Sequence, residues 1–207
     1  MGLFKRFLGQ TRKPEGFFGK LMLNAMNQGH AALSDWGLSH IEELSPLVIA
    51  ELGCGGGRNA RELLRRYPLS KLYAVDYSAL AVCRTRAYNK PDIVRGRCRV
   101  LKASVQSLPL AASRFDLATA FETVYFWPGL AECFAEVYRI LKCGGSFLIC
   151  NESDGTDAEG LRYERIIDGM RCYTAEELET LLRTAGFSEV RIFRHETKPW
   201  LTMLAKK

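Results

Sequence analysis

The stretch that decides the fold of this 207-residue sequence is Glu51-Leu52-Gly53-Cys54-Gly55-Gly56-Gly57. It completes an apolar run over residues 47–52, and such a run followed by glycines is typical of a strand buried on both faces of a parallel sheet. A glycine loop between a strand and a helix lets a ligand lie against bare backbone, because a Cβ atom there would collide with it. The sequence therefore predicts a ligand-binding loop at the end of the first strand.

Strands and helices alternate from this loop onward. After the first strand, helices are expected over 59–67, 78–89 and 129–141, and strands over 71–76, 97–103, 115–121 and 146–151. Alternation of this kind is typical of a doubly wound parallel sheet with helices on both faces. The chain is therefore expected to be an α/β protein.

The last part of the chain breaks this alternation. Thr174-Ala175-Glu176-Glu177 has the capping-box pattern that begins a helix, and Gly186 ends that helix. Two strands, 189–194 and 200–205, follow with no helix between them and should pair as a hairpin turned at Lys198-Pro199. A dinucleotide-binding domain would add parallel strands instead, so this ending argues against that class.

A carboxylate follows the second strand. Asp76 lies roughly 20 residues beyond the glycine loop, where a carboxylate accepts hydrogen bonds from the ribose hydroxyls of a nucleotide-type ligand. The pyrophosphate-binding pattern G-x-G-x-x-G fails, because Arg58 stands at its third glycine. Asp76 therefore indicates an adenosine-containing ligand without choosing between the classes that bind one.

The wider pattern resembles the class I S-adenosylmethionine (SAM)-dependent methyltransferases, in their small-molecule branch. The segments that carry the resemblance are the pattern E/D-x-G-x-G-x-G at 51–57, VLKASVQSLPLAASRFDLATAFETVYFWPGL at 100–130 and VYRILKCGGSFLI at 137–149. The resemblance covers roughly residue 47 to the end. It implies a Rossmann-like, doubly wound, seven-stranded sheet closed by a C-terminal antiparallel hairpin, with SAM as methyl donor and S-adenosylhomocysteine as product.

The resemblance also implies which residues hold SAM. An acidic residue at the head of the loop meets the amino group of the methionine part, and an acidic residue after the third strand usually meets the adenine. Ser104 stands in that last place here. The residues expected to bind the cofactor are Glu51, Gly53, Gly55, Gly57, Asp76, Tyr77, Ser104, Val105 and Phe121. Arg58 either meets the SAM carboxylate or is a solvated residue of the following helix.

The acceptor side is expected in the loop after the fourth strand, since loops at strand carboxyl ends line the site in open α/β sheets. Glu122 and Tyr125 lie there, and His30 is a candidate general base from the region ahead of the first strand. His40 is an alternative base, although a lone histidine on a helix is more often structural. The aromatic run Tyr125-Phe126-Trp127 could form a flat pocket, with at least one ring in the core.

Several motifs of other methyltransferase branches are absent. There is no NPPY- or DPPY-type tetrapeptide, no pair of catalytic cysteines for cytosine methylation, and no aspartate set that would hold magnesium. These absences favour a small-molecule acceptor over a nucleic-acid base or a metal-bound catechol. No metal site is expected.

Two segments are expected to act as lids. Residues 1–45 would form N-terminal lid helices over 17–27 and 31–43, ahead of a single SAM-binding domain at 46–207. Trp36 would either cover the cofactor or fill the seam between helix and sheet. The second lid candidate is the polar stretch 152–171, which lies between the fifth strand and the last helix.

The composition of the chain indicates its cellular location and its binding partners. No apolar run approaches the roughly 18 residues that span a bilayer, and the start lacks the features of a signal peptide. Seven scattered cysteines, an odd number, favour reduced thiols, so a cytoplasmic location is expected. The chain is also expected to be a monomer or a homodimer. A net charge of +6 could attract RNA, but the basic residues at 84–102 are spread over a helix, its exit and a strand, which favours a solvated face.

Three alternatives to small-molecule methylation stay open. An RNA or protein methyltransferase is favoured by the charge and disfavoured by the missing target motifs. A SAM or nucleotide sensor without catalysis would share the binding loop. A dehydrogenase is the third, and the closing hairpin argues against it.

Overall fold

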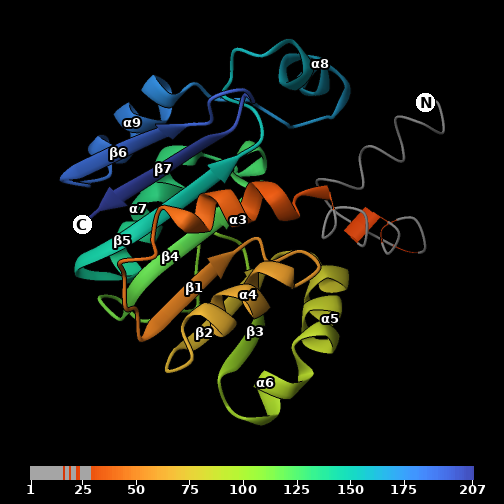
Figure 1. Ribbon diagram of the computed structural model, residues 1–207, viewed down its shortest axis with the longest axis vertical. Coiled ribbons are helices and arrows are strands. Elements are labelled where there is room, and N and C mark those ends of the chain that lie inside the picture. Colours follow the sequence, from red (N-terminus) through yellow and green to blue (C-terminus); the bar gives the residue numbers. More distant parts are fainter. Residues whose placement is uncertain (1–15, 17–18, 20–21, 24–28) are drawn as a thin grey trace.

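The computed structural model describes residues 16, 19, 22–23 and 29–207. Seven strands form one sheet in the order β3-β2-β1-β4-β5-β7-β6 (Figure 1). Their bounds are β1 Val48–Leu52, β2 Lys71–Asp76, β3 Cys98–Lys102, β4 Phe115–Phe121, β5 Leu141–Asn151, β6 Glu189–Arg194 and β7 Leu201–Lys206. Strands β1 to β5 pair in parallel, whereas β7 pairs antiparallel with both β5 and β6. The predicted sheet with its closing hairpin is confirmed.

The helices of the described residues mostly lie where the alternation predicts them. They are α3 Ala31–Ser39, α4 Arg58–Arg66, α5 Ala79–Tyr88, α6 Lys90–Val94, η2 Val124–Phe126, α7 Leu130–Ile140, α8 Ala158–Ile166 and α9 Ala175–Thr184. Ser78 caps α5 by accepting from the Ala81 N–H, and Thr174 and Glu177 form both hydrogen bonds of the predicted capping box. The short helices α6 and α8 were not expected.

The sheet is covered on both faces (Figure 1). Side chains of α7 and α9, such as Phe134 and Leu178, pack on one face, and side chains of α3, α4 and α5, such as Leu63 and Val82, pack on the other. Because both faces are buried, the central strands are mostly apolar, and most of the polar groups that could do chemistry lie at or near the carboxyl ends of the strands. The two layers thereby place the site at one edge of the sheet.

Helix α3 differs from the lid expected over residues 31–43. It ends at Ser39, and it packs flat on the sheet, because Gly37 lets the backbone approach Cys150 of β5. The Cys150 thiol donates a hydrogen bond to the Leu33 carbonyl at 3.6 Å. Helix α3 is therefore part of the core, and only His30 at its amino-terminal end reaches the pocket described below. The helix expected over 17–27 falls largely outside the described residues.

Two further expectations concern membranes and cysteines. None of the helices in the described ranges combines the length and the apolar character that crossing a bilayer requires. All seven cysteines are unpaired. Cys54, Cys98, Cys133, Cys150 and Cys172 are buried, as is common for cysteines that act as small apolar residues.

The contact between α3 and β5 can be tested with Gly37→Ala. A Cβ atom at Gly37 would lie 2.6 Å from the Cys150 sulfur, so we expect the free energy of unfolding to fall by about 1–3 kcal/mol, measured by urea denaturation. Gly29→Ala is the matched control, because nothing lies within 4 Å of its Cβ position. Adding Cys150→Ala should recover part of the loss. Equal stability of the Gly37 and Gly29 variants would contradict this packing.

Candidate functional site

The glycine loop is held by the neighbouring strand. The N–H groups of Gly53 and Cys54 donate to the Val75 carbonyl of β2 at 2.8 and 3.0 Å. Gly53, Gly55 and Gly57 have φ angles of 85°, 49° and 85°, in the left-handed region that favours glycine. The loop conformation therefore requires glycine at all three positions, as the sequence predicts.

The three glycines meet different surroundings. A Cβ atom on Gly53 would collide with the side chain of Thr123, and one on Gly57 would lie 2.8 Å from the Thr85 Cα atom of α5. At Gly55, by contrast, the nearest atom is a methyl of Leu23 at 3.8 Å. Gly53 and Gly57 thus let elements pack closely, whereas Gly55 is the position where backbone is open to a ligand.

Asp76 braces the loop. Its carboxylate accepts hydrogen bonds from the N–H of Gly55 at 3.0 Å and of Ser78 at 2.8 Å, and also from the N–H of Tyr77. Burial raises the pKa of the Asp76 carboxyl, and these three donors lower it in part. The residue expected to meet a ribose therefore also links the first loop to the second strand.

Glu51 is a buried carboxyl without a complete set of partners. It is 2% exposed, and its Oε2 atom receives no hydrogen bond from the described residues. Burial, with a further contribution from Asp76, raises the pKa of Glu51 to about 8. A cationic group at this position would offset both effects, so the site fits the amino group of a methionine-derived ligand.

The remaining residues predicted to bind the cofactor lie at the same edge of the sheet. Tyr77 is 41% exposed after β2, and Ser104 and Val105 follow β3. The Ser104 hydroxyl accepts from the Gln106 N–H at 3.3 Å, within its own turn. Phe121 differs, because its ring is buried near Gly37 of α3 and its side chain belongs to the core.

Arg58 had two interpretations from the sequence. Its guanidinium forms two hydrogen bonds of 2.8 Å with the carboxylate of Asp35. Asp35 lies on α3 and Arg58 begins α4, so the pair joins these two helices. The structure thus gives Arg58 a structural partner.

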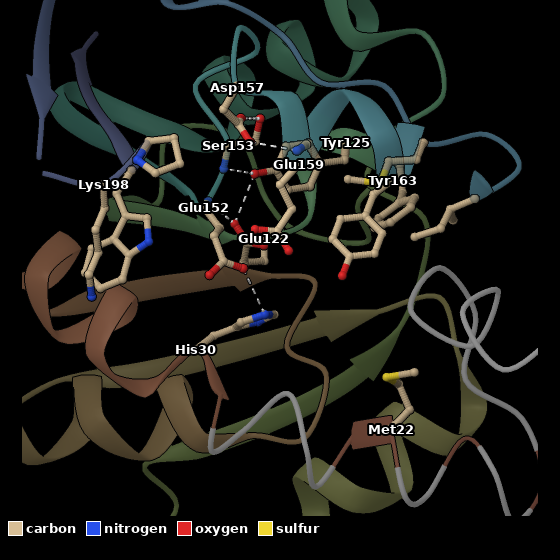
Figure 2. A pocket seen from close by; sticks show the side chains of 16 residues that line it. Met22, His30, Glu122, Tyr125, Glu152, Ser153, Asp157, Glu159, Tyr163 and Lys198 are labelled. Atoms are coloured by element: carbon tan, nitrogen blue, oxygen red, sulfur yellow. Dashed lines mark hydrogen bonds and ion pairs between the residues drawn. The ribbon is translucent and has the colours of Figure 1, made fainter. Parts of the chain in front are cut away.

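A cavity of about 620 Å³ opens beside the loop (Figure 2). Its walls come from the loop after β4, the segment from β5 through α8, the β6–β7 turn, and the region ahead of α3. The lining residues are Met22, His30, Glu122, Tyr125, Phe126, Glu152, Ser153, Asp157, Glu159, Gly160, Tyr163, Ile167, Met170, Lys198, Pro199 and Trp200. All three residues predicted for the acceptor side, Glu122, Tyr125 and His30, therefore meet in one cavity.

Glu122 is held in a strained conformation by its neighbours. Its φ angle is 59°, which is rare for a residue with a side chain. One carboxylate oxygen accepts from the Tyr125 hydroxyl at 3.1 Å and from the N–H of Glu152. The Ser153 N–H in turn donates to the Tyr125 hydroxyl at 3.0 Å. Burial raises the pKa of Glu122 to about 8, and the charge of Glu152 adds to this.

His30 completes the polar group. Its Nε2 atom lies 3.6 Å from a carboxylate oxygen of Glu152 (Figure 2). Burial lowers the pKa of His30, and Glu152 raises it in part, which favours a neutral imidazole. Potential ligand atoms of His30, Glu122 and Glu152 all lie within 4.8 Å of one another, a grouping not expected from the sequence. A cation, metallic or organic, is therefore a chemically suitable occupant.

The glycine loop contacts the segment that lines the cavity. Thr123 packs against Gly53 of the loop, and its hydroxyl donates to the Leu52 carbonyl at 3.1 Å. Glu122, the residue before it, faces the cavity. A ligand on the glycine loop and a second ligand in the cavity would therefore lie next to each other.

Sequence reasoning missed part of the cavity. Glu152 and Tyr163 lie in the segment predicted as a lid, which does form a wall, but no pattern marked them individually. Lys198 comes from the predicted hairpin turn and Trp200 from the start of the strand predicted after it, and no function was assigned to either. Trp127 stacks on Phe147 in the core, as expected of one ring in its run.

The alternative base His40 lies away from the cavity. Its ring stacks on Phe193 with centroids 4.0 Å apart, and it also meets the edge of Trp36. Trp36 lies beside His195 and Trp200 of the hairpin region, so it fills the seam between helix and sheet. Both residues are structural in this arrangement.

Comparisons with known proteins agree with this geometry. The family model for a methyltransferase domain matches residues 50–149. Malonyl-[acyl-carrier protein] O-methyltransferase of Geobacter sulfurreducens is 29% identical over 162 residues, which are 73% of this chain and 60% of that protein. Cycloartenol-C-24-methyltransferase 1 of Oryza sativa subsp. japonica is 28% identical over 103 residues, 50% of this chain and 30% of that protein.

A solved structure supports the fold. A SAM-dependent methyltransferase from Aquifex aeolicus superimposes with a TM-score of 0.74 at 16% identity, covering 89% of this chain and 96% of that one. The two curated relatives are longer, and the chain spans between about a third and three fifths of their length.

The buried carboxyl of Glu51 gives a pH-dependent prediction. Because its folded-state pKa is raised, its favourable contribution is fully present below about pH 4.5 and is lost as the pH rises towards 8. Glu51→Gln should remove this dependence. The unfolding free energy of the variant minus that of the parent should therefore be about 1–4 kcal/mol larger at pH 8.5 than at pH 5. Urea denaturation at several pH values measures this.

The control for this experiment is Glu189→Gln, which changes an exposed carboxyl at the start of β6. The difference in unfolding free energy between parent and Glu51→Gln should change with pH, beyond any change seen with the control. Curves for parent and Glu51→Gln that stay parallel from pH 5 to pH 8.5 would contradict the assignment.

Proposed function

The chain belongs to the class I SAM-dependent methyltransferases, and we propose that it transfers the methyl group of SAM to a small-molecule acceptor in the 620 Å³ cavity. The observation that carries this proposal is the contact of Thr123 with the glycine loop, because the residue before it, Glu122, lines the cavity. Methyl transfer is a direct displacement, so donor and acceptor must lie in line and in contact. Adjacent sites of this kind supply that arrangement.

The residues of the loop would bind the cofactor. When bound, SAM supplies a sulfonium whose methyl group is electrophilic, so no covalent bond to the protein is required. Glu51 has an unpartnered buried oxygen for the amino group of the methionine part, and Gly55 has open backbone. Asp76 would meet the ribose hydroxyls while still bracing the loop, and Tyr77, Ser104 and Val105 would lie towards the adenine. Gly53 and Gly57 would act by shaping the loop.

The acceptor side would contribute position and a proton acceptor. Glu122 is the leading base, because its raised pKa is near neutrality and its carboxylate faces the cavity. Tyr125 would act as a positioning residue through its hydrogen bond to Glu122. His30, with a lowered pKa, is a second base for acceptors bound nearer α3.

An RNA or protein acceptor is the second candidate, favoured by the charge of +6. Several arginines are, however, engaged within the fold: Arg97 donates to the carbonyls of Leu64 and Tyr67, and Arg58 pairs with Asp35. The two curated relatives are named for cycloartenol and malonyl-[acyl-carrier protein], not for a nucleic acid. A small molecule is therefore favoured over RNA, and steep loss of acceptor affinity with added salt would instead indicate a polyanion.

A non-catalytic SAM-binding protein is the remaining candidate. It would bind SAM and release no S-adenosylhomocysteine with any acceptor.

We also propose a cytoplasmic location, since seven unpaired cysteines suit a reducing compartment. The prediction of a monomer or homodimer is kept.

The proposed activity can be tested directly. Small molecules that co-purify with the protein would be identified by mass spectrometry, and a metabolite library would then be assayed for release of S-adenosylhomocysteine. We expect acceptor-dependent release that is lost in Glu122→Gln. SAM binding without release from any small molecule, together with release from RNA or protein substrates, would favour the second candidate.

Asp76→Ala tests the cofactor site. Loss of hydrogen bonds to a charged group costs roughly 1.5–3 kcal/mol, so SAM affinity should fall by about ten- to a hundredfold in calorimetry. Asp92→Ala is the control, because Asp92 pairs with Arg97 of the neighbouring segment and should leave SAM affinity unchanged. An unchanged affinity in a folded Asp76 variant would remove this residue from the site.

A further inference from the structure

The cavity has an excess of acidic groups. Of the described residues, its lining holds the carboxyls of Glu122, Glu152, Asp157 and Glu159, against one ammonium, Lys198. Asp157 is engaged as the cap of α8, where it accepts from the Gly160 N–H at 2.7 Å and from the Ser153 hydroxyl. Three carboxyls therefore stay available to a ligand.

Two of these carboxyls come together from different strands. Glu122 follows β4 and Glu152 follows β5, and both point to the centre of the cavity (Figure 2). One oxygen of Glu122 accepts two hydrogen bonds, and its other oxygen receives none from the described residues. Two neighbouring carboxyls repel each other when both are ionised, and a cation between them relieves the repulsion and favours the ionised form of both. An anionic acceptor would meet this repulsion.

The walls around the acidic pair are aromatic. Rings of Tyr125, Phe126, Tyr163 and Trp200 line the cavity. The ammonium of Lys198 lies 3.8 Å from the centroid of the Trp200 ring, an example within the lining of an ammonium group against an aromatic ring. Aromatic faces with nearby carboxylates are the common means of binding organic cations. A volume of about 620 Å³ is also far larger than a bare metal ion fills.

We propose that the methyl acceptor is a primary or secondary amine, cationic in solution, whose nitrogen lies between Glu122 and Glu152 and whose carbon skeleton lies against the aromatic walls. This inference rests on the proposed function. It identifies the atom that receives the methyl group as nitrogen, because Glu122 and Glu152 together favour a positively charged group near the glycine loop. His30, as a neutral imidazole beside Glu152, accepts a further N–H of the amine.

The chemistry of such a step balances. An ammonium has no lone pair, so one proton must first move from the nitrogen to the carboxylate of Glu122. The freed lone pair then forms the N–CH₃ bond while the CH₃–S bond breaks, and its electron pair stays on sulfur. The products are S-adenosylhomocysteine and the N-methylated ammonium, and Glu122 releases its proton to solvent.

The experiment begins with SAM binding to the parent protein, measured by calorimetry. S-adenosylhomocysteine-loaded protein is then titrated with a panel of amines, each paired with its neutral alcohol, such as 2-phenylethylamine with 2-phenylethanol and n-butylamine with n-butanol. We expect at least one amine to bind ten or more times more tightly than its alcohol. Glu122→Gln and Glu152→Gln should each weaken that binding tenfold or more, whereas Glu189→Gln should not.

Turnover and metal titration complete the test. The amine that binds should give S-adenosylhomocysteine release and an N-methylated product in mass spectrometry, and Glu122→Gln should lose this release while keeping SAM affinity. If SAM binds but no amine exceeds its alcohol, the inference is overturned and the proposed function stands. If SAM fails to bind, the proposed function fails first. Binding of Zn²⁺ or Mn²⁺ that His30→Ala abolishes, and that excludes the amines, would also overturn the inference.

Discussion

The close contact between Gly53 and Thr123 is the constraint on which the candidate site depends. Because Gly53 has no Cβ atom, the loop after β1 and the loop after β4 can touch, and the Thr123 hydroxyl fixes their spacing by bonding the Leu52 carbonyl. Gly55, whose backbone is open, follows Gly53 by two residues, and Glu122, which lines the cavity, immediately precedes Thr123. Any larger residue at position 53 would push the glycine loop away from the segment that lines the cavity. Direct displacement tolerates little such separation.

The candidate site contains buried carboxyl groups whose ionisation is unfavourable, and bound cations could make it favourable. Glu51 and Glu122 both have pKa values raised to about 8 by burial, each with a second carboxyl beside it. Glu122 also has a strained backbone. A protein selected for stability alone would not bury two such groups, and perturbed carboxyls of this kind gather at functional sites. Each of the two faces a place proposed for a cation: the amino group of the cofactor for Glu51, and the amine for Glu122.

The covering helices decide how the cavity is closed. Helix α3 is fixed to the sheet by Gly37 and to α4 by the Asp35–Arg58 pair, so His30 is held at the cavity by a rigid element. The opposite wall is the segment of α8, which stands at the outside of the fold next to the β6–β7 hairpin (Figure 1). The cavity thus lies between His30, which is held by the fixed helix α3, and the segment of α8, which connects β5 to α9. Variation in such a segment can change the acceptor without changing the sheet.

The sequence by itself determined the sheet and the conformation of the glycine loop, because these depend on local pattern. Strands β2, β4 and β6 have the predicted bounds, Ser78 and Thr174 cap helices as predicted, and the three glycines adopt the conformation that their spacing implies. Only the tertiary structure decided that α3 is a core helix, that Phe121 faces it, and that Glu152, Tyr163 and Trp200 join Glu122 in one cavity. These residues lie far apart in the chain and in elements of different kinds. Periodicity reports which face of an element is apolar, whereas the meeting of side chains depends on how those elements pack.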